Sequence, residues 1–289
     1  MVDQQYLKGA FLVVAATLCF AFQPIFGRLA YSDGMDAIGL LWLRFLLAAV
    51  LLHLFTRRGD SGSCLKPFLI GVVLSAGAMS YFTALQSLSV GLTTLLFYLF
   101  PIYIFLFSVL LRQESVSWLK LKAVILAITG ISVSVDTESS LPFGGLVCGL
   151  IAGACYGGYI MLSNRYLVKE KPFQSLKWVT TGAVCCISLP FLAGQGELPQ
   201  SAVGFGAALG LCLICTLLSL MLLLIGTRMM GRSTDVAVIT TVEIGSTLFL
   251  AWLLLNETIR LQEIIGAGLV FVAAIVVVLA RGREQKAVG

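Results

Sequence analysis

Two ionisable residues, Glu243 and Arg44, stand inside long apolar stretches of the sequence. If these stretches cross a membrane as helices, counting from Asp235 and Asp36 at about 1.5 Å per residue places each about 12 Å deep. A charge at that depth is costly and usually faces a cavity or a partner. We therefore interpret both as candidates for substrate binding or ion coupling. The structural alternatives are a carboxyl that locks two helices and an arginine that reaches back to the headgroups.

Glu243 and Arg44 are also natural partners for one another. Because they are counted from opposite surfaces of about 30 Å of hydrocarbon, their Cα atoms would differ in depth by only about 6 Å. A mutual ion pair would be structural, whereas separate side chains could meet a carboxylate and an ammonium of a solute. The sequence leaves these alternatives open.

Two prolines in apolar runs, Pro24 and Pro101, predict helix breaks, since each leaves a backbone carbonyl free one turn earlier. Such breaks persist in membranes where neighbours or a wet cavity satisfy the backbone. Polar and aromatic residues in the apolar runs complete the candidate site, although aromatic residues in spans serve more often in packing. These further candidates are Gln23, Tyr98, Tyr81, Tyr159 and Thr241.

The sequence contains no motif that supports metal binding or catalysis. Cys212-x-x-Cys215 has metal-site spacing but lies in Leu-rich sequence without a nearby histidine, so we interpret both thiols as packing residues. The single histidine, His53, excludes a two-His zinc motif. No Gly-x-Ser-x-Gly elbow is present. We predict no catalytic residue, no metal, no cofactor and no enzymatic activity.

The elements that must position these residues are transmembrane helices. The chain of 289 residues is 59% hydrophobic and 11% charged, which indicates a membrane protein rather than a soluble or nucleic-acid-binding one. We predict ten spans. They lie at 9–30, 37–56, 67–88, 91–111, 120–135, 144–164, 175–194, 203–225, 235–255 and 262–280. In the sixth, glycines recur every four residues and predict close helix packing, at Gly145, Gly149, Gly153 and Gly157.

The basic residues predict the orientation. Of the 19 Lys and Arg residues, all but Arg28, Arg44 and Arg260 fall on one side of the ten-span arrangement. Cytoplasmic loops carry this excess. We therefore predict a multi-pass protein of the plasma or inner membrane with both termini in the cytoplasm.

The chain also resembles itself. Residues 17–21 (TLCFA) align with 153–157 (GACYG), and residues 110–115 (LLRQES) align with 253–258 (LLLNET). The order of elements is kept, and each half contains five spans. An odd number of spans places the halves in opposite orientations, as in secondary transporters. We predict an all-α protein of two inverted five-helix repeats, 1–138 and 139–289.

Residues 242–257, led by Glu243 and followed by Gly266 and Gly268, resemble the ninth and tenth helices of EamA-type transporters of the drug/metabolite transporter superfamily. Residues 101–114 resemble the matching part of the first repeat. The chain departs from the family pattern at Ile244, where proline is frequent, and at 19–21, where Trp-Gly is frequent.

This resemblance implies a carrier that moves a small metabolite across the bilayer by alternating access, with efflux as one possible direction. Arg44 and Glu243 favour an amino acid or related amphipathic compound as the expected substrate. A channel or lipid-translocating protein is the alternative, and a membrane-embedded enzyme is less favoured. The expected assembly is a monomer or homodimer. The sequence leaves open the substrate, import against export, and ion or proton coupling.

Overall fold

The chain folds into membrane-length helices. The computed structural model describes residues 4–56, 64–112, 118–134, 142–167, 170–230, 236 and 239–288, and no strand occurs among them. Within these residues, seven helical segments are long and apolar enough to span a bilayer, and three shorter apolar helices accompany them. These segments account for the ten predicted spans, and the prediction of an all-α membrane protein with two inverted five-helix repeats is confirmed.

The described residues of the first half form seven helices, because two of its spans are broken. They are α1 (Gln4–Ala21), α2 (Gln23–Ser32), α3 (Ala37–Phe55), α4 (Leu65–Ser87), α5 (Val90–Phe97), α6 (Phe100–Leu110) and α7 (Trp118–Ser134). The predicted division between the third and fourth spans is found at Leu88 and Ser89. The Ser89 hydroxyl accepts a hydrogen bond from the Leu92 N–H, which caps the first turn of α5.

The second half begins at α8 (Phe143–Tyr166). It continues with α9 (Pro172–Pro190) and η1 (Phe191–Gln195), then α10 (Ala202–Cys212), η2 (Leu213–Leu218), α11 (Ser219–Met230), α13 (Val242–Leu255) and α14 (Leu261–Val288). Here η1 and η2 are π-helical turns.

The ninth span differs from its prediction. The sequence predicts one helix from Asp235, but α13 begins at Val242, so Glu243 lies in the first turn of a short helix. Asp235 itself lies outside the described residues. The prediction missed the later start of α13 because the sequence shows the length of an apolar run but not the position of a helix break within it.

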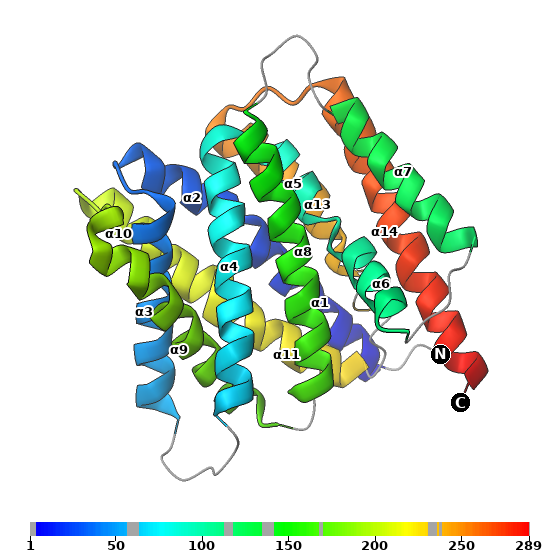
Figure 1. Cartoon of the computed structure of the whole chain (residues 1–289), viewed down its shortest axis with the longest axis horizontal. Helices are drawn as coiled ribbons and strands as arrows, with labels where there is room; N and C mark the ends of the chain where they lie inside the picture. Colours follow the sequence, from blue (N-terminus) through cyan, green and yellow to red (C-terminus); the bar gives the residue numbers. More distant parts are fainter. Residues whose placement is uncertain are drawn as a thin grey trace.

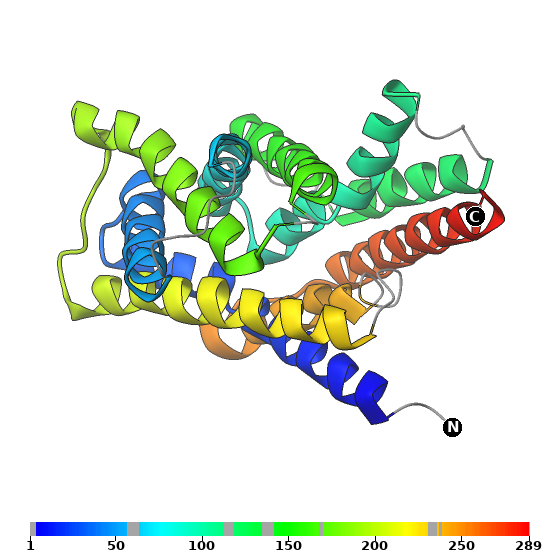
Figure 2. The same ribbon diagram turned by 90° about the horizontal axis from the view of Figure 1, so that it is seen from below.

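The helix contacts repeat when the two halves are exchanged. The pair α4–α8 corresponds to α11–α1, α4–α9 to α10–α3, and the packing of α5 and α6 on α8 to that of α13 on α1. Equivalent helices of the two halves also meet, in the pairs α3–α9, α5–α13 and α7–α14. Figures 1 and 2 show α7 beside α14 along one edge of the bundle. This exchange symmetry is what two repeats of opposite orientation require.

The predicted glycine stripe of α8 packs against the broken fourth span. A Cβ on Gly153 would lie 2.9 Å from the Leu96 carbonyl oxygen, and one on Gly157 would lie 3.0 Å from the Phe100 carbonyl oxygen. Helices approach this closely only where side chains are absent. The interpretation of the stripe as a packing surface is confirmed.

Polar contacts join the two halves at the end that carries the α2–α3 connection, which we call the outer end after the predicted topology. Asp36 Oδ1 accepts the Glu197 N–H at 3.0 Å. Asp33 accepts the backbone N–H groups of Gln200 at 2.9 Å and Ser201 at 3.0 Å, and the Ser201 hydroxyl. The Ser201 hydroxyl and these N–H groups lower the pKa of Asp33, because they stabilise its ionised form.

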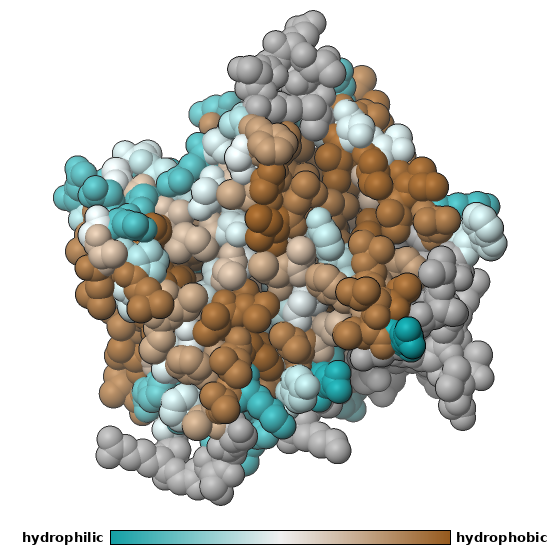
Figure 3. Space-filling view, in the orientation of Figure 1, coloured by the Kyte–Doolittle hydropathy of each residue, from teal (hydrophilic) through white to brown (hydrophobic). Residues whose placement is uncertain are grey.

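The surface is mostly apolar, as a bilayer requires. Hydrophobic residues cover the middle of the face in Figure 3, and hydrophilic ones gather mainly toward its margins. Large apolar side chains such as Phe11, Phe55 and Trp118 are exposed. Such an area would be unfavourable in water but is favourable against lipid tails.

Candidate substrate site

Helix breaks in the fourth and ninth spans meet in the bundle. In the fourth span, α5 ends at Phe97 and α6 begins at Phe100, with Pro101 in its first turn. In the ninth, α13 begins at Val242 after a turn at Thr241. The Tyr98 hydroxyl donates a hydrogen bond of 3.2 Å to the Thr240 carbonyl. The two spans are equivalent in the two repeats, so this contact joins matching breaks.

Glu243 lies at this junction. Its carboxyl lies within interaction distance of the Tyr98 hydroxyl. Tyr81, Tyr156 and Cys215 lie near enough to interact with it electrostatically. Tyr98 and Tyr81 are buried, whereas Glu243 keeps part of its surface exposed. The carboxyl therefore has one neutral phenol partner and retains acceptor capacity for a further group.

Arg44 occupies a separate polar pocket. The side chain is buried on α3, its Nε donates to Thr216 Oγ1 at 2.9 Å, and its Nη2 donates to Gln23 Oε1 at 3.1 Å. Gln23 begins α2, directly after the break at Phe22 and before Pro24. Both partners are neutral. A guanidinium offers five N–H donors, so two bonds leave others for an anionic group.

The π-helical turn η2 places Thr216 beside Arg44. Thr216 Oγ1 also donates to the carbonyl of Leu211, five residues earlier, at 2.9 Å. In the same turn, the Cys215 thiol donates to the Cys19 carbonyl at 3.1 Å. π-Helical turns within α-helices occur frequently at functional sites. This turn brings the second half of the chain onto the breaks of the first.

Arg44 and Glu243 form no ion pair within the described residues. Each has neutral partners, whereas the ion pair that the structure shows joins Arg28 to Glu257. Tyr81 and Cys215 interact electrostatically with both Arg44 and Glu243. Both charges therefore lie within electrostatic reach of Tyr81 and Cys215, and no contact between the two neutralises them.

A cluster of aromatic rings lies beside Glu243. The Tyr156 ring centroid lies 4.7 Å from that of Phe97, 5.1 Å from Phe100 and 5.7 Å from Tyr159. Tyr81 contacts Phe97 edge-on at 5.3 Å. These rings come from α4, α8 and the break between α5 and α6. They offer a wall for the apolar body of a solute.

The structure thus sorts the predicted residues into two groups. Gln23 lies with Arg44, and Tyr98 lies with Glu243. Thr241 precedes Glu243 by two residues, at the start of α13. Tyr81 lies near both groups, and Tyr159 reaches the aromatic cluster through Tyr156.

Sequence reasoning missed Thr216, Phe97 and Phe100. The available signals were a lone threonine in a Leu-rich run and aromatic residues on both sides of a predicted break. His53 lies away from these groups: its Nδ1 is 2.9 Å from the Ala49 carbonyl, and its ring contacts Trp178.

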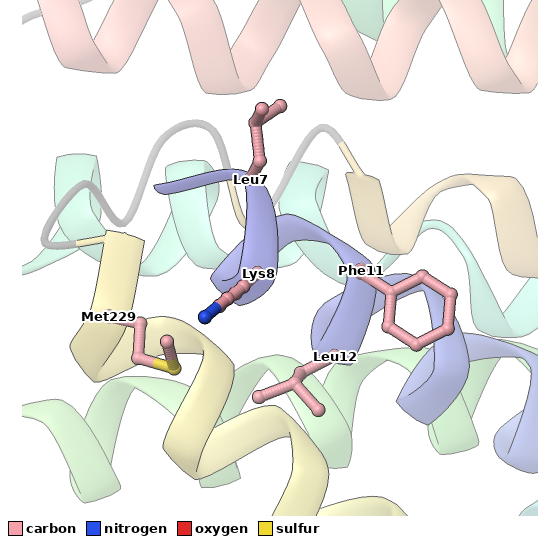
Figure 4. A pocket seen from close by; sticks show the side chains of 5 residues that line it. All are labelled: Leu7, Lys8, Phe11, Leu12 and Met229. Atoms are coloured by element: carbon pink, nitrogen blue, oxygen red, sulfur yellow. The ribbon is translucent and has the colours of Figure 1, made fainter. Parts of the chain in front are cut away.

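Neither Arg44 nor Glu243 lines either of two surface depressions. One, of about 460 Å³, is formed by Leu7, Lys8, Phe11, Leu12 and Met229 between α1 and α11 (Figure 4). The other, of about 590 Å³, lies between α13 and α14, and Thr241, Val242 and Ile244 are among its lining residues. In the described part of the chain, no group of three His, Cys, Asp or Glu side chains is placed to hold a metal ion.

Comparisons with known proteins agree with this architecture. A profile of the EamA-like transporter family matches residues 7–135 and 143–279. An uncharacterized transporter of Archaeoglobus fulgidus is 23% identical over 271 residues, covering 93% of this chain and 95% of the relative. The uncharacterized transporter YcbK of Bacillus subtilis is 23% identical over 288 residues, covering 91% and 90%. A protein of known crystal structure shares the fold, with a TM-score of 0.66, 14% identity and coverage of 96% and 98%.

Proposed function

The chain belongs to the EamA-like transporter family, and on this premise we propose that it carries a small zwitterionic metabolite by alternating access. Family membership makes it a multi-pass membrane transport protein rather than an enzyme, with a small molecule as substrate. The proposed substrate class is an amino acid or a related amphipathic compound. Arg44 is proposed to meet its carboxylate and Glu243 its ammonium.

The observation that carries this proposal is the separation of the two charges. Arg44 is buried with only neutral hydrogen-bond partners, Gln23 and Thr216. A buried charge without a counter-charge is unfavourable unless a ligand compensates it for part of the cycle. Glu243 likewise has a neutral partner, Tyr98. A zwitterion compensates both charges at once.

The aromatic cluster supports an apolar body between the two charged ends. Phe97, Phe100 and Tyr156 are each partly exposed, and they pack on one another and on Tyr98 beside Glu243. Small-molecule sites typically combine an apolar wall with a few convergent polar groups. Aromatic and large aliphatic amino acids fit this arrangement better than small polar ones.

The direct test is substrate exchange in proteoliposomes containing the purified protein. We expect saturable, stereoselective flux of a large apolar L-amino acid, and little flux of either the matching amine or the matching carboxylic acid. Flux that does not saturate would instead indicate a channel. Equal flux of all three compounds would contradict the two-charge site while leaving transport itself intact.

We propose that both termini face the cytoplasm of a plasma or inner membrane, in a monomer or homodimer, with repeats at 1–138 and 139–289. The distribution of Lys and Arg supports the orientation. Figure 1 supports a common side for the two termini, since both lie at the end opposite the α13–α14 connection. A cysteine introduced at position 61 of a cysteine-free variant is expected to react with an impermeant maleimide from the cytoplasmic side alone. Reaction from outside intact cells would contradict the orientation.

A further inference from the structure

A cluster of polar contacts closes the outer end of the bundle above the fourth and ninth spans. Arg28 Nη2 donates to the Leu88 carbonyl at 2.6 Å and forms an ion pair with Glu257 Oε1 at 3.3 Å. Glu257 Oε2 accepts the Val90 N–H at 3.2 Å. Next to it, the Ser89 hydroxyl donates to Glu263 Oε1 at 3.1 Å. We call the Arg28, Leu88, Val90 and Glu257 contacts the outer latch.

The outer latch joins three separate parts of the chain. Arg28 belongs to α2, Leu88 and Val90 belong to the α4–α5 turn, and Glu257 belongs to the α13–α14 connection. The first two parts lie in the first half of the chain and the third lies in the second half. The latch therefore crosses the boundary between the repeats.

The two helices that the latch holds lead directly to the proposed site. α5 runs about 12 Å from Val90 to the break at Tyr98, and α13 runs about 18 Å from Glu243 to its last residue, Leu255, two residues before Glu257, at 1.5 Å per residue. Between these ends, Leu95 and Leu248 are buried in one apolar cluster with Tyr98. The latch and this cluster close the space between α5 and α13.

We propose that the outer latch is the outer gate of the carrier, closed in this structure, and that its opening separates α5 from α13 and exposes the site to the outer side. This inference rests on the proposed alternating-access function. Opening must release the contacts of Glu257 to both Arg28 and Val90, because they hold α2 and the start of α5 to the α13–α14 connection.

The electrostatics of the latch predict which substitution opens it. Burial raises the pKa of Glu257, while Arg28 and the Val90 N–H oppose this shift and Glu263 adds to it. Removal of Arg28 leaves a partly buried carboxylate without its cation, which favours the open state. Neutralising both partners removes that penalty. Arg28→Gln is therefore expected to open the gate, and Arg28→Gln with Glu257→Gln to close it again.

The test measures access to position 94, which lies on α5 one turn above Tyr98 and is buried in this structure. Thr94→Cys is placed in a variant lacking the eight native cysteines, and its reaction with an impermeant maleimide is timed in right-side-out vesicles. We expect Arg28→Gln to raise the labelling rate at least about fivefold, because Glu257 loses its cation. The expected factor is modest because both side chains of the pair are roughly one quarter exposed, so solvent already weakens their attraction. The double variant is expected to return toward the unmodified rate.

Glu197→Gln is the matched control, because it removes an exposed carboxyl at the same end. Acidification slows labelling in every variant, because the maleimide reacts with the thiolate of position 94. In Arg28→Gln the slowing is expected to be larger than in the double variant, since protonation of Glu257 also removes the unpaired charge. An equal pH response in the two variants would contradict the role of Glu257.

Hydrogen–deuterium exchange over residues 90–97 gives a second readout that keeps the native cysteines. It is expected to rise in Arg28→Gln and to fall in the double variant. If the labelling rate and the hydrogen exchange of Arg28→Gln equal those of Glu197→Gln, the outer latch is not the outer gate. Neither measurement uses a substrate, so the test of the gate can be interpreted even if the proposed transport activity is not found.

Discussion

Glu243→Gln is expected to reduce zwitterion exchange in proteoliposomes by at least about 30-fold, equivalent to about 2 kcal/mol. The substitution keeps the shape of the side chain and its place beside Tyr98. It removes the negative charge that we assign to the substrate ammonium. It also removes a titrating group, so the remaining flux should lose the part of its pH dependence that depends on this carboxyl.

The measurement is initial-rate exchange of radiolabelled amino acid as a function of pH, with the amount of folded protein determined by size-exclusion chromatography. Glu197→Gln again serves as the control, because it changes the same functional group on an exposed side chain. Near-normal flux with an unchanged pH profile would remove Glu243 from the mechanism. A poorly folded Glu243→Gln protein would indicate a structural role, and Glu243→Asp would then separate charge from shape.

Arg44→Gln is expected to lower exchange of the amino acid by a similar factor, at least about 30-fold. Its effect on the carboxamide analogue of the same amino acid should be smaller, because that analogue offers no carboxylate to the guanidinium. The ratio of the two fluxes is therefore the informative quantity. Arg44→Lys keeps the charge but loses the planar fork of donors that bonds Thr216 and Gln23, so partial activity is expected.

The charge exchange Arg44→Glu with Glu243→Arg separates substrate contact from structural pairing. Since the two side chains form no ion pair in the described structure, the double variant is expected to fold but to remain inactive. Recovery of much of the lost flux would show that they pair during the cycle. Equal losses for the amino acid and its carboxamide in Arg44→Gln would also count against a carboxylate contact.

The sequence alone determined the membrane class, the ten apolar segments and the two five-span repeats. These properties depend on the length and order of apolar runs, which the bilayer selects almost independently of how the helices pack. The α4–α5 division was predictable from Gly91 and from the repeat, and the structure places it at Leu88 and Ser89. Glu243 and Arg44 were identifiable because charge is rare in such runs.

The tertiary structure decided which side chains meet. Counting residues along assumed straight helices made Arg44 and Glu243 plausible partners, but helix breaks and the η2 turn give each residue a different neighbour. Thr216 reaches Arg44, and Arg28 reaches Glu257, from the opposite half of the chain. Such contacts depend on the rotation of each helix about its axis and on where its hydrogen-bond ladder is interrupted. Hydrophobic periodicity carries little of this information when both lipid and protein interior favour apolar side chains.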